Sequence, residues 1–521
     1  MPLSSNRWLQ LITLAGLALL CWNAGNTTVW DDETNGFFLA KEPLPQLLQL
    51  MASNVHEDPP LYDLALHYWQ QWAGYDPFKL RLLSIGCWIF ALWGLFKCGE
   101  RWGGQRAGWL VLVVAVWMPY HWMFPAAIRW YSMFAALAGW NLYALLRAMA
   151  LPHNRTGAEF RFNWGDFTVY VLSGAAMWYC NYSAPVVFLA QGAALMSTVA
   201  LKRGPWLWMI SAWAVIGLLY LPWLPVFFRQ LGLSASAFSL PHTVASLYAI
   251  FAGEVSIPYE WWISLPVAVT AAATLALGLQ TRSMTRFVAV IVVVILGLLV
   301  VKNVIWTKRL LIFTPFLALL IGIALASISR HSPPAQRLAK AVFLVAAMAA
   351  LIGSLANLIR RDGWLTYRWL VPTGEVVAEI QKEQPGSLIL SNSNSVAFYC
   401  HDPLGLGLFG RFPERVVEME MMPFHSLLAA DTLKLIMGRL KQTEKAVYIH
   451  DSSSAVCSSV MPWIESQMQA AGFAKGAVVP LAMASAGYLQ HHPGTGGQIA
   501  QIDRARLVVA YFQRVSPVSH P

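Results

Sequence analysis

The stretch NRWLQLITLAGLALLCWNAGNTTVWDDETNG, residues 6–36, joins an apolar run to three consecutive carboxylates, Asp31, Asp32 and Glu33. Residues 8–23 carry no charged side chain, which is typical of a helix that crosses a lipid bilayer. The run lacks a convincing small-residue cleavage site of the signal-peptide kind, so we expect it to remain as a first membrane span. The fold prediction therefore starts from a span that leads directly into acidic residues.

The rest of the chain is too apolar for a soluble domain. Of its 521 residues, 57% are hydrophobic and only 12% are charged, and the apolar residues come in long runs. We therefore predict an α-helical polytopic membrane protein with about 11 transmembrane helices. The predicted spans lie near residues 8–23, 82–97, 107–121, 125–146, 167–181, 184–200, 206–225, 261–279, 287–301, 310–328 and 340–359.

Basic residues predict which loops face the cytoplasm. If the N-terminus is cytoplasmic, the loops on that side hold most of the Lys and Arg residues, among them Arg7, Lys97, Arg101, Arg106 and Arg147. This bias explains much of the net charge of +10 without a nucleic acid as partner. An odd number of spans then places both the loop 24–81 and the segment 361–521 outside the cytoplasm.

The first of these two parts concentrates the acidic residues of the chain. Eight of the 26 Asp and Glu residues fall within 24–81, whereas residues 81–360 hold only five. Residues 44–53 and 61–74 have the apolar spacing of amphipathic helices that lie in the membrane interface. We therefore expect a transmembrane domain over 1–360 whose first extracytoplasmic loop, 24–81, carries the polar chemistry.

The composition changes after residue 361. Helical spacing alternates there with short β-type runs, which predicts a small, separately folded α/β domain over 361–521. The expected helices are 374–384 and 424–442, and the expected strands are 387–391, 446–450, 476–482 and 506–515. Cys400 and Cys457 belong to this segment, and the sequence leaves open whether they form a disulfide.

Carboxylates form the first candidate for chemistry. A carboxylate near a membrane surface can act as a general base toward a hydroxyl or an amine when its surroundings adjust its pKa. Asp31, Asp32 and Glu33 are candidates, together with the polar run formed by His56, Glu57 and Asp58. The alternative is that these are solvated loop residues. A divalent cation that bridges the two acidic groups also stays open, although the chain has no spacing typical of a metal site.

Cations form the second candidate. Arg129 lies at the exported end of a predicted span with almost no other charge nearby, which suits a bound phosphate or carboxylate. Lys302, Lys308 and Arg309 cluster in a short exported loop against the charge bias, as expected for an anionic lipid ligand. The alternatives are an Arg that snorkels to the interface and cations that contact lipid headgroups. The aromatic span ends 177–185 and 221–230 favour interfacial anchors.

The order of these motifs resembles the GT-C membrane glycosyltransferases. The resemblance is to the family 39 type, which is related to protein O-mannosyltransferases and to the bacterial lipid A aminoarabinose transferase. It covers about 1–330. The motifs are an acid pair after the first span, the sequence PPLY at 59–62, A-x-R-x-Y-S at 127–132, LPWLP at 221–225 and R-L-L-x-x-x-P at 309–315.

The resemblance implies an inverting transfer of a hexose or pentose from a polyprenyl-phosphate donor to a lipid, glycan or protein acceptor. Asp32 and Glu33 match the acid pair of the family, which makes Asp32 the expected base, and Arg129, Tyr131 and Arg309 match its phosphate-binding residues. Asp31, His56, Glu57, Asp58, Tyr62, Lys302 and Lys308 complete the expected substrate site. No cofactor is required. Relatives often carry His or Lys at the position of Asp58, which leaves the donor sugar open.

Other functions stay in competition with the transferase. A transporter or flippase of lipid-linked sugars also needs many spans and cations for phosphate, but the chain shows no internal repeat of the transporter kind. A scaffold whose α/β domain binds a partner is a third reading. We expect a location in the bacterial inner membrane, as part of the cell envelope, with the α/β domain in the periplasm.

Overall fold

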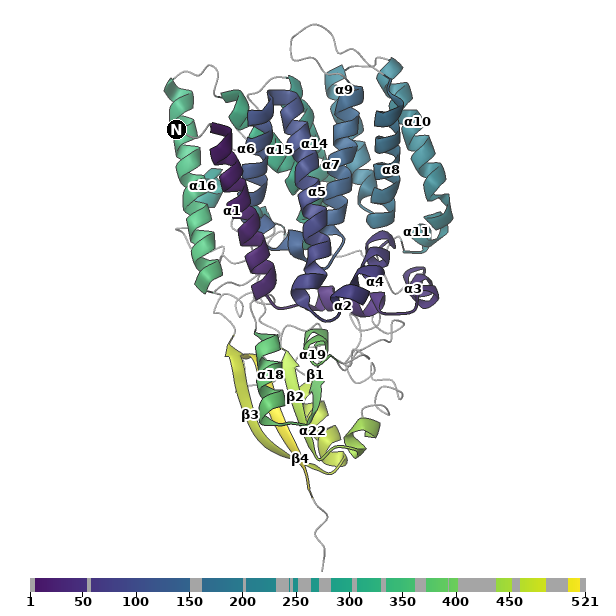
Figure 1. Ribbon diagram of the computed structural model, residues 1–521, viewed down its shortest axis with the longest axis vertical. Coiled ribbons are helices and arrows are strands. Elements are labelled where there is room, and N and C mark those ends of the chain that lie inside the picture. Colours follow the sequence, from purple (N-terminus) through teal and green to yellow (C-terminus); the bar gives the residue numbers. More distant parts are fainter. Residues whose placement is uncertain are drawn as a thin grey trace, which may run out of the picture. The chain divides into compact units, whose positions relative to one another are not determined.

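The structure of the protein is a computed structural model, shown as a ribbon in Figure 1. It describes residues 5–53, 58–149, 162–199, 203–230, 243, 247–251, 264–270, 283–301, 307–328, 334–360, 372–391, 393–401, 437–451, 460–483 and 505–515. The chain divides into two compact units, each treated by itself below. The helical unit comprises Met1–Gly25, Glu57–Trp69 and Phe78–Arg360, and the α/β unit comprises Asn26–His56, Gln70–Pro77 and Arg361–Pro521.

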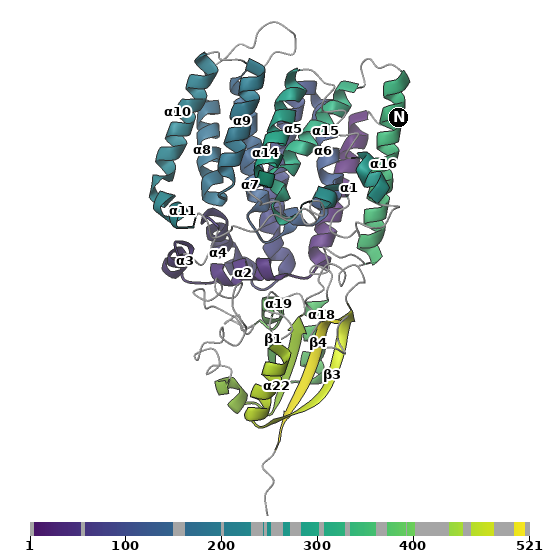
Figure 2. The same cartoon turned by 180° about the vertical axis from the view of Figure 1, so that it is seen from behind.

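Long helices that run side by side build the helical unit (Figures 1 and 2). Many of their large apolar side chains face outward, such as Leu14, Leu218 and Val345, which are 61%, 64% and 69% exposed. Apolar surface of this kind is stable against lipid tails and not against water. The described helices of this unit include α1 (Ser5–Asn26), α5 (Pro77–Gly103), α6 (Gln105–Trp117), α7 (Tyr131–Ala148), α8 (Trp164–Cys180), α9 (Ala184–Val199), α10 (Arg203–Tyr220), α11 (Leu224–Gln230), α14 (Ser283–Val301), α15 (Thr314–Ile328) and α16 (Pro334–Arg360).

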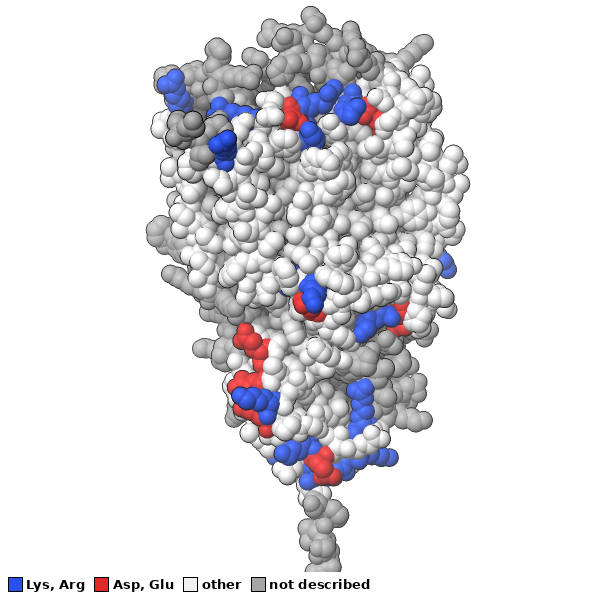
Figure 3. Space-filling view, in the orientation of Figure 1, with Lys and Arg blue, Asp and Glu red and all other residues white. Residues whose placement is uncertain are grey.

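The described helices confirm a membrane protein. Asn6–Asn26, Pro77–Gly103 and Gly204–Gln230 are long and apolar enough to cross a bilayer, and several shorter apolar helices accompany them in the described part of the chain. The number of about 11 spans stays a prediction, since most of the expected span 261–279 lies outside the described residues. Figure 3 shows Lys and Arg side chains gathered at one end of this bundle, next to a broad band of uncharged surface.

The chain departs from the predicted spans 107–121 and 125–146. α6 ends at Trp117, and two short 3-10 helices, η1 (Pro119–Trp122) and η2 (Phe124–Ala126), precede α7. The axis bends by 72° between α6 and the turn that follows it. Pro119 and Pro125 lack the N–H that a continuous α-helix needs, so the two α-helices stop short of the predicted span ends that face each other.

Glycines bring neighbouring helices of the bundle into close contact. A Cβ atom at Gly322 of α15 would lie 2.6 Å from the Cα atom of Val111 in α6. A Cβ atom at Gly94 of α5 would lie 3.3 Å from the backbone of Gly139 in α7. Small residues at such crossings allow the close van der Waals packing that replaces the hydrophobic effect inside a membrane.

A mixed sheet of four strands forms the centre of the α/β unit. The strands are β1 (Leu388–Ser391), β2 (Lys445–Asp451), β3 (Phe473–Met483) and β4 (Ala505–Arg514), in the order β1-β2-β4-β3. β1 pairs parallel to β2, and the other two pairings are antiparallel. All four predicted strand segments are therefore strands. The helices are α18 (Thr373–Glu383), α19 (Asn394–Tyr399) and α22 (Val460–Ala470), and most of the helix expected over 424–442 lies outside the described residues.

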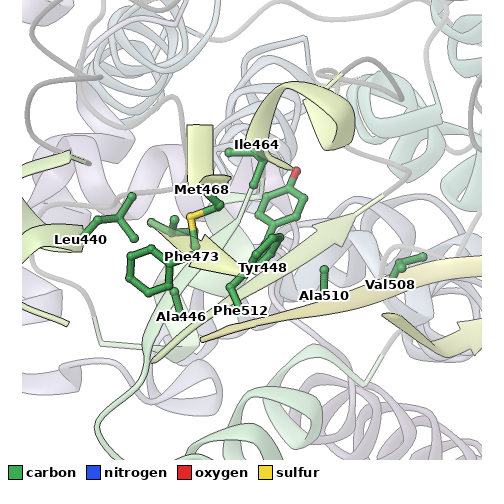
Figure 4. Close-up of a cluster of buried hydrophobic side chains, with 10 residues drawn as sticks. Leu440, Ala446, Tyr448, Ile464, Met468, Phe473, Val508, Ala510 and Phe512 are labelled. Carbon is green, nitrogen blue, oxygen red and sulfur yellow. The ribbon is translucent and has the colours of Figure 1, made fainter. Parts of the chain in front are cut away.

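Helices cover both faces of this sheet. Alternate residues of β2 and β4 meet α18 and α19 on one face, where Val447 and Val509 pack against Ile380 and Val396. The other residues of these strands, such as Tyr448 and Phe512, pack against Ile464 and Met468 of α22 (Figure 4). The sheet is thus the middle layer of three, as expected where both faces of a strand are apolar.

Gly322→Ala is expected to lower the thermal midpoint of the purified protein in detergent. The new methyl group would overlap the backbone of Val111, and overpacking of this kind typically costs about 1–3 kcal/mol. Gly297→Ala in α14 is the matched control, because nothing lies within 4 Å of its added Cβ atom and alanine favours the helix. Equal midpoints for the two variants would contradict the close packing of α15 on α6.

Candidate functional site

The acid triplet opens a helix, α2 (Asp31–Ala40), which the sequence did not predict. Three carboxylates in a first turn stabilise a helix because they face the positive end of its dipole. Glu33 adds a specific contact, since its Oε2 atom accepts the backbone N–H of Trp30 at 3.2 Å. Glu33 is fully buried, whereas Asp32 stays half-buried. The geometry therefore gives Glu33 a capping contact and leaves Asp32 the more accessible carboxylate.

An ion pair marks the polar site of the helical unit. The Arg129 Nη2 atom lies 2.6 Å from Asp58 Oδ2, and the two side chains are 16% and 14% exposed. Asn181 fixes the second carboxylate oxygen by donating from Nδ2 to Oδ1 at 3.2 Å. Breaking such a poorly hydrated pair by removing one charge is costly, about 3–5 kcal/mol in typical proteins. Asp58 and Asn181 thus hold the guanidinium of Arg129 in one place.

Non-helical backbone places Arg129 at this position. The residue follows η2 and precedes α7, and its own N–H donates to the carbonyl of Ala127 at 2.7 Å. Ser132, in the first turn of α7, donates to the carbonyl of Pro125 at 2.6 Å and so closes the connection. The break in the predicted span is what puts a charged side chain beside the loop that carries Asp58.

A second set of polar side chains continues from this ion pair. Tyr182 follows Asn181 directly, donates to Gln230 and accepts from Trp223 Nε1 at 3.1 Å. Burial raises the pKa of Tyr182 to about 12, the charge of Asp58 acts in the same direction, and the hydrogen bond from Trp223 opposes both. The hydroxyl therefore keeps its proton at neutral pH. This network lies within the span ends that the sequence analysis interpreted as interfacial anchors.

Three other expected binding residues, Arg309, Tyr131 and Tyr62, are described by the structure, and they differ in burial. Arg309 is half-buried in the 3-10 helix η4 (Thr307–Ile312), which packs against α7 and η2 and so brings Arg309 to the part of the helical unit that carries Arg129. Tyr131 and Tyr62 are both 2% exposed, and Tyr62 shares a hydrogen bond of 2.9 Å with Ser84. Both tyrosines are packed inside the helical unit.

Several expected residues cannot be placed in the site. His56, Glu57 and Lys302 lie outside the described residues, and of Asp31 and Lys308 only the backbone is described. The divalent cation suggested between Asp31 or Asp32 and Glu57 stays a prediction. Among the residues that the structure describes, no three His, Cys, Asp or Glu side chains gather as metal ligands. Cys457 also falls outside this part, so its pairing with Cys400 stays open.

Some polar residues of the site had no signal in the sequence. Asn181, Tyr182 and Gln230 come from segments far from Asp58 along the chain, and single polar residues at span ends are common. Within the α/β unit, Tyr399 of α19 also had no signal in the sequence, and its hydroxyl accepts the backbone N–H of Val29 at 3.0 Å, just before α2. Only a fold that joins distant segments reveals such partners.

Comparison with known proteins shows which known fold the chain shares. No protein-family model and no curated protein matches the sequence. The crystal structure of ArnT from Cupriavidus metallidurans bound to undecaprenyl phosphate matches with a TM-score of 0.56, covers 99% of this chain and 100% of that chain, and is 12% identical. The chain has a GT-C fold. This finding confirms the fold that the motifs predicted.

Two further solved structures accompany this match. ArnT from the same organism in the apo state aligns with a TM-score of 0.55 and 13% identity, over 97% of each chain. The arabinofuranosyltransferase AftD from mycobacteria aligns at 0.48 and 17% identity, over 98% of this chain and 40% of that chain. The GT-C fold assignment depends on the ArnT structures alone. At these identities it gives the architecture and leaves the reaction to the site residues.

Glu33→Ala is expected to lower the thermal midpoint, whereas Glu33→Gln is expected to leave it nearly unchanged. Glutamine keeps an oxygen that can accept the N–H of Trp30, and loss of a helix cap typically costs about 1 kcal/mol. Thermal unfolding of both variants in detergent provides the measurement. Equal losses in the two variants would show that the charge of Glu33, rather than the cap, stabilises the helix.

Proposed function

We propose that the protein is an inverting glycosyltransferase that moves a sugar from a polyprenyl-phosphate donor to an acceptor at the extracytoplasmic face of the membrane. The observation that carries the proposal is the alignment of the chain, over almost its whole length, with ArnT bound to undecaprenyl phosphate. The acidic start of α2 and the fixed guanidinium of Arg129 supply the two kinds of group that this chemistry needs.

Asp32 is the proposed general base. Its half-buried carboxylate takes the proton of an acceptor hydroxyl or amine, and the freed electron pair attacks the anomeric carbon of the donor. The bond between that carbon and the phosphate oxygen breaks in the same displacement, and the electron pair leaves with the polyprenyl phosphate. A single displacement inverts the anomeric centre.

Arg129 and Arg309 are the proposed ligands of the departing phosphate. A guanidinium presents two parallel N–H donors that fit phosphate oxygens, and it stays charged at any physiological pH. Neutralising the charge that grows on the phosphate lowers the barrier, so the reaction requires no resident cofactor. Lys302 and Lys308 are proposed to assist from the segment that leads to Arg309.

The membrane sets the class of substrates. A lipid-linked donor reaches a site at the membrane surface by diffusion within the bilayer, and the acceptor is a lipid, a glycan or a protein on the same side. A hexose or a pentose fits the proposal. The proposed location is the bacterial inner membrane, with the α/β unit in the periplasm.

Asp32→Asn is expected to reduce sugar transfer by about 10²–10⁴-fold, the usual contribution of a general base. Membranes that contain the variant are incubated with a panel of polyprenyl-phosphate sugars, and released polyprenyl phosphate is measured by mass spectrometry. Asp76→Asn is the matched control, since Asp76 belongs to the same loop and is also half-buried. Two results would overturn the proposal in favour of a transporter. One is transport of lipid-linked sugar without release of polyprenyl phosphate, and the other is equal release from the wild-type protein, Asp32→Asn and Asp76→Asn.

Arg129→Gln combined with Asp58→Asn is expected to weaken binding of undecaprenyl phosphate at least tenfold while the protein stays folded. The double variant removes both charges of the pair, so neither is left buried alone, as it would be in Arg129→Gln. Microscale thermophoresis with undecaprenyl phosphate in detergent measures the affinity, with Lys97→Gln combined with Glu100→Gln as the control that removes another ion pair of the helical unit. Unchanged affinity in the double variant would exclude Arg129 as a phosphate ligand.

A further inference from the structure

Helix α19 of the α/β unit contacts the acidic helix α2 at several points. Tyr399 accepts the N–H of Val29 through its hydroxyl at 3.0 Å, one residue before the cap of α2. Asn394, at the other end of α19, donates to Asn35 Oδ1 at 2.7 Å. These two hydrogen bonds join the start and the middle of α2 to residues that come about 360 positions later in the chain.

Aromatic rings fill the space between the same two helices. Phe37 of α2 meets Phe398 edge to face at 5.0 Å between ring centroids, and Tyr75 lies 5.0 Å from Phe37 and 5.5 Å from Phe398. Lys41 donates to the hydroxyl of Tyr75 at 2.7 Å. Ring pairs in this geometry contribute about 0.5–1.5 kcal/mol each beyond their buried area, so α2 is fixed against rotation about its axis.

The sheet in turn fixes α19. The helix follows β1 directly, Ser393 caps its first turn, and Val396 packs into the core with Val447 and Ile449 of β2. α18 provides a seat for Tyr399, because a Cβ atom at Gly374 would lie only 2.8 Å from the Tyr399 ring. Glycine at position 374 therefore leaves room for the ring whose hydroxyl meets Val29.

We infer that Tyr399, seated on Gly374, is a positioning residue for the proposed base Asp32, and that the α/β unit serves catalysis by holding α2. This inference rests on the proposed function. Val29 lies three residues before Asp32, so the hydrogen bond from its N–H sets where the first turn of α2 begins. A base acts efficiently only within hydrogen-bond reach of the proton it removes, and small displacements lower the rate without changing the affinity for the donor.

Tyr399→Phe tests the inference by removing a single oxygen atom, because phenylalanine keeps the ring contacts and loses only the hydroxyl. Hydrogen–deuterium exchange of the full-length protein in detergent is expected to speed up at least fivefold in peptides that cover residues 28–36. Peptides from β2 and from α5 are expected to keep their exchange rates. Tyr511→Phe is the matched control, since it removes another half-buried tyrosine hydroxyl of the α/β unit, on β4, and leaves the Tyr399 hydroxyl in place.

The kinetic arm uses whichever polyprenyl-phosphate sugar supports transfer by the wild-type protein. Tyr399→Phe is expected to lower kcat about five- to tenfold, the effect of one ordinary hydrogen bond on the position of a base, with KM for the donor unchanged. Gly374→Ala is expected to act in the same direction, because it displaces the ring. In the Asp32→Asn background, Tyr399→Phe is expected to have no further effect.

The outcomes separate this inference from the proposed function. Full transfer activity in Asp32→Asn would overturn the proposed function and with it the role of α2. Loss of transfer in Asp32→Asn together with wild-type kcat in Tyr399→Phe would overturn only the positioning role. A rise in KM at constant kcat, or unchanged exchange over residues 28–36, would also contradict it.

Discussion

Inside a bilayer, backbone groups have no water to bond, and this constraint shapes the segment on which the candidate site depends. Between α6 and α7 the chain leaves the α-helical conformation, and side chains from other helices bind the carbonyls that are released. Asn23 of α1 donates to the carbonyl of Trp122 at 2.9 Å, and His121 bonds the carbonyl of Ala115 at 2.6 Å and the hydroxyl of Thr314 at 2.8 Å. With these bonds in place, irregular backbone can present Arg129 to Asp58 at low cost.

The charged groups proposed for the reaction are stabilised in two different ways. Arg129 lies in the helical unit, where a carboxylate and an amide hold it, and Asp32 lies in the first turn of the short helix α2. Each arrangement agrees with the physics of its own surroundings. A guanidinium is stable among helices when a carboxylate and an amide hold it, and a carboxylate at a helix N-terminus is stabilised by the dipole.

The sequence predicted those features that arise from local patterns. Short apolar runs of β type located β2 and β4, amphipathic spacing located α3 (Leu44–Met51) and α4 (Leu61–Ala73), and motif order predicted the GT-C fold. It missed α2, whose capping contact between Glu33 and Trp30 is too short a pattern to stand out. It also extended the two predicted spans, 107–121 and 125–146, into the 3-10 segment around Pro119 and Pro125, because the residues there are as apolar as a span.

The partners of the site residues were beyond any local pattern. Asn181 meets Asp58 across 123 positions, and Tyr399 meets Val29 across 370. Such contacts depend on how whole elements pack, which composition and periodicity do not encode. The amino-acid sequence therefore indicated which kinds of side chain the proposed chemistry needs. The structure showed which neighbouring residues hold these side chains in position.

The joining of α2 to α19 also has a consequence for biosynthesis. A ribosome adds about 5–20 residues per second, so roughly 20–70 seconds separate the synthesis of the acidic helix from that of its partner. During that interval the aromatic face of Phe37 lacks Phe398, and the N–H of Val29 lacks the hydroxyl of Tyr399. The proposed base therefore gains these positioning contacts only after residues 394–399 have been made, so an unfinished polypeptide that ends before them is expected to transfer sugar more slowly.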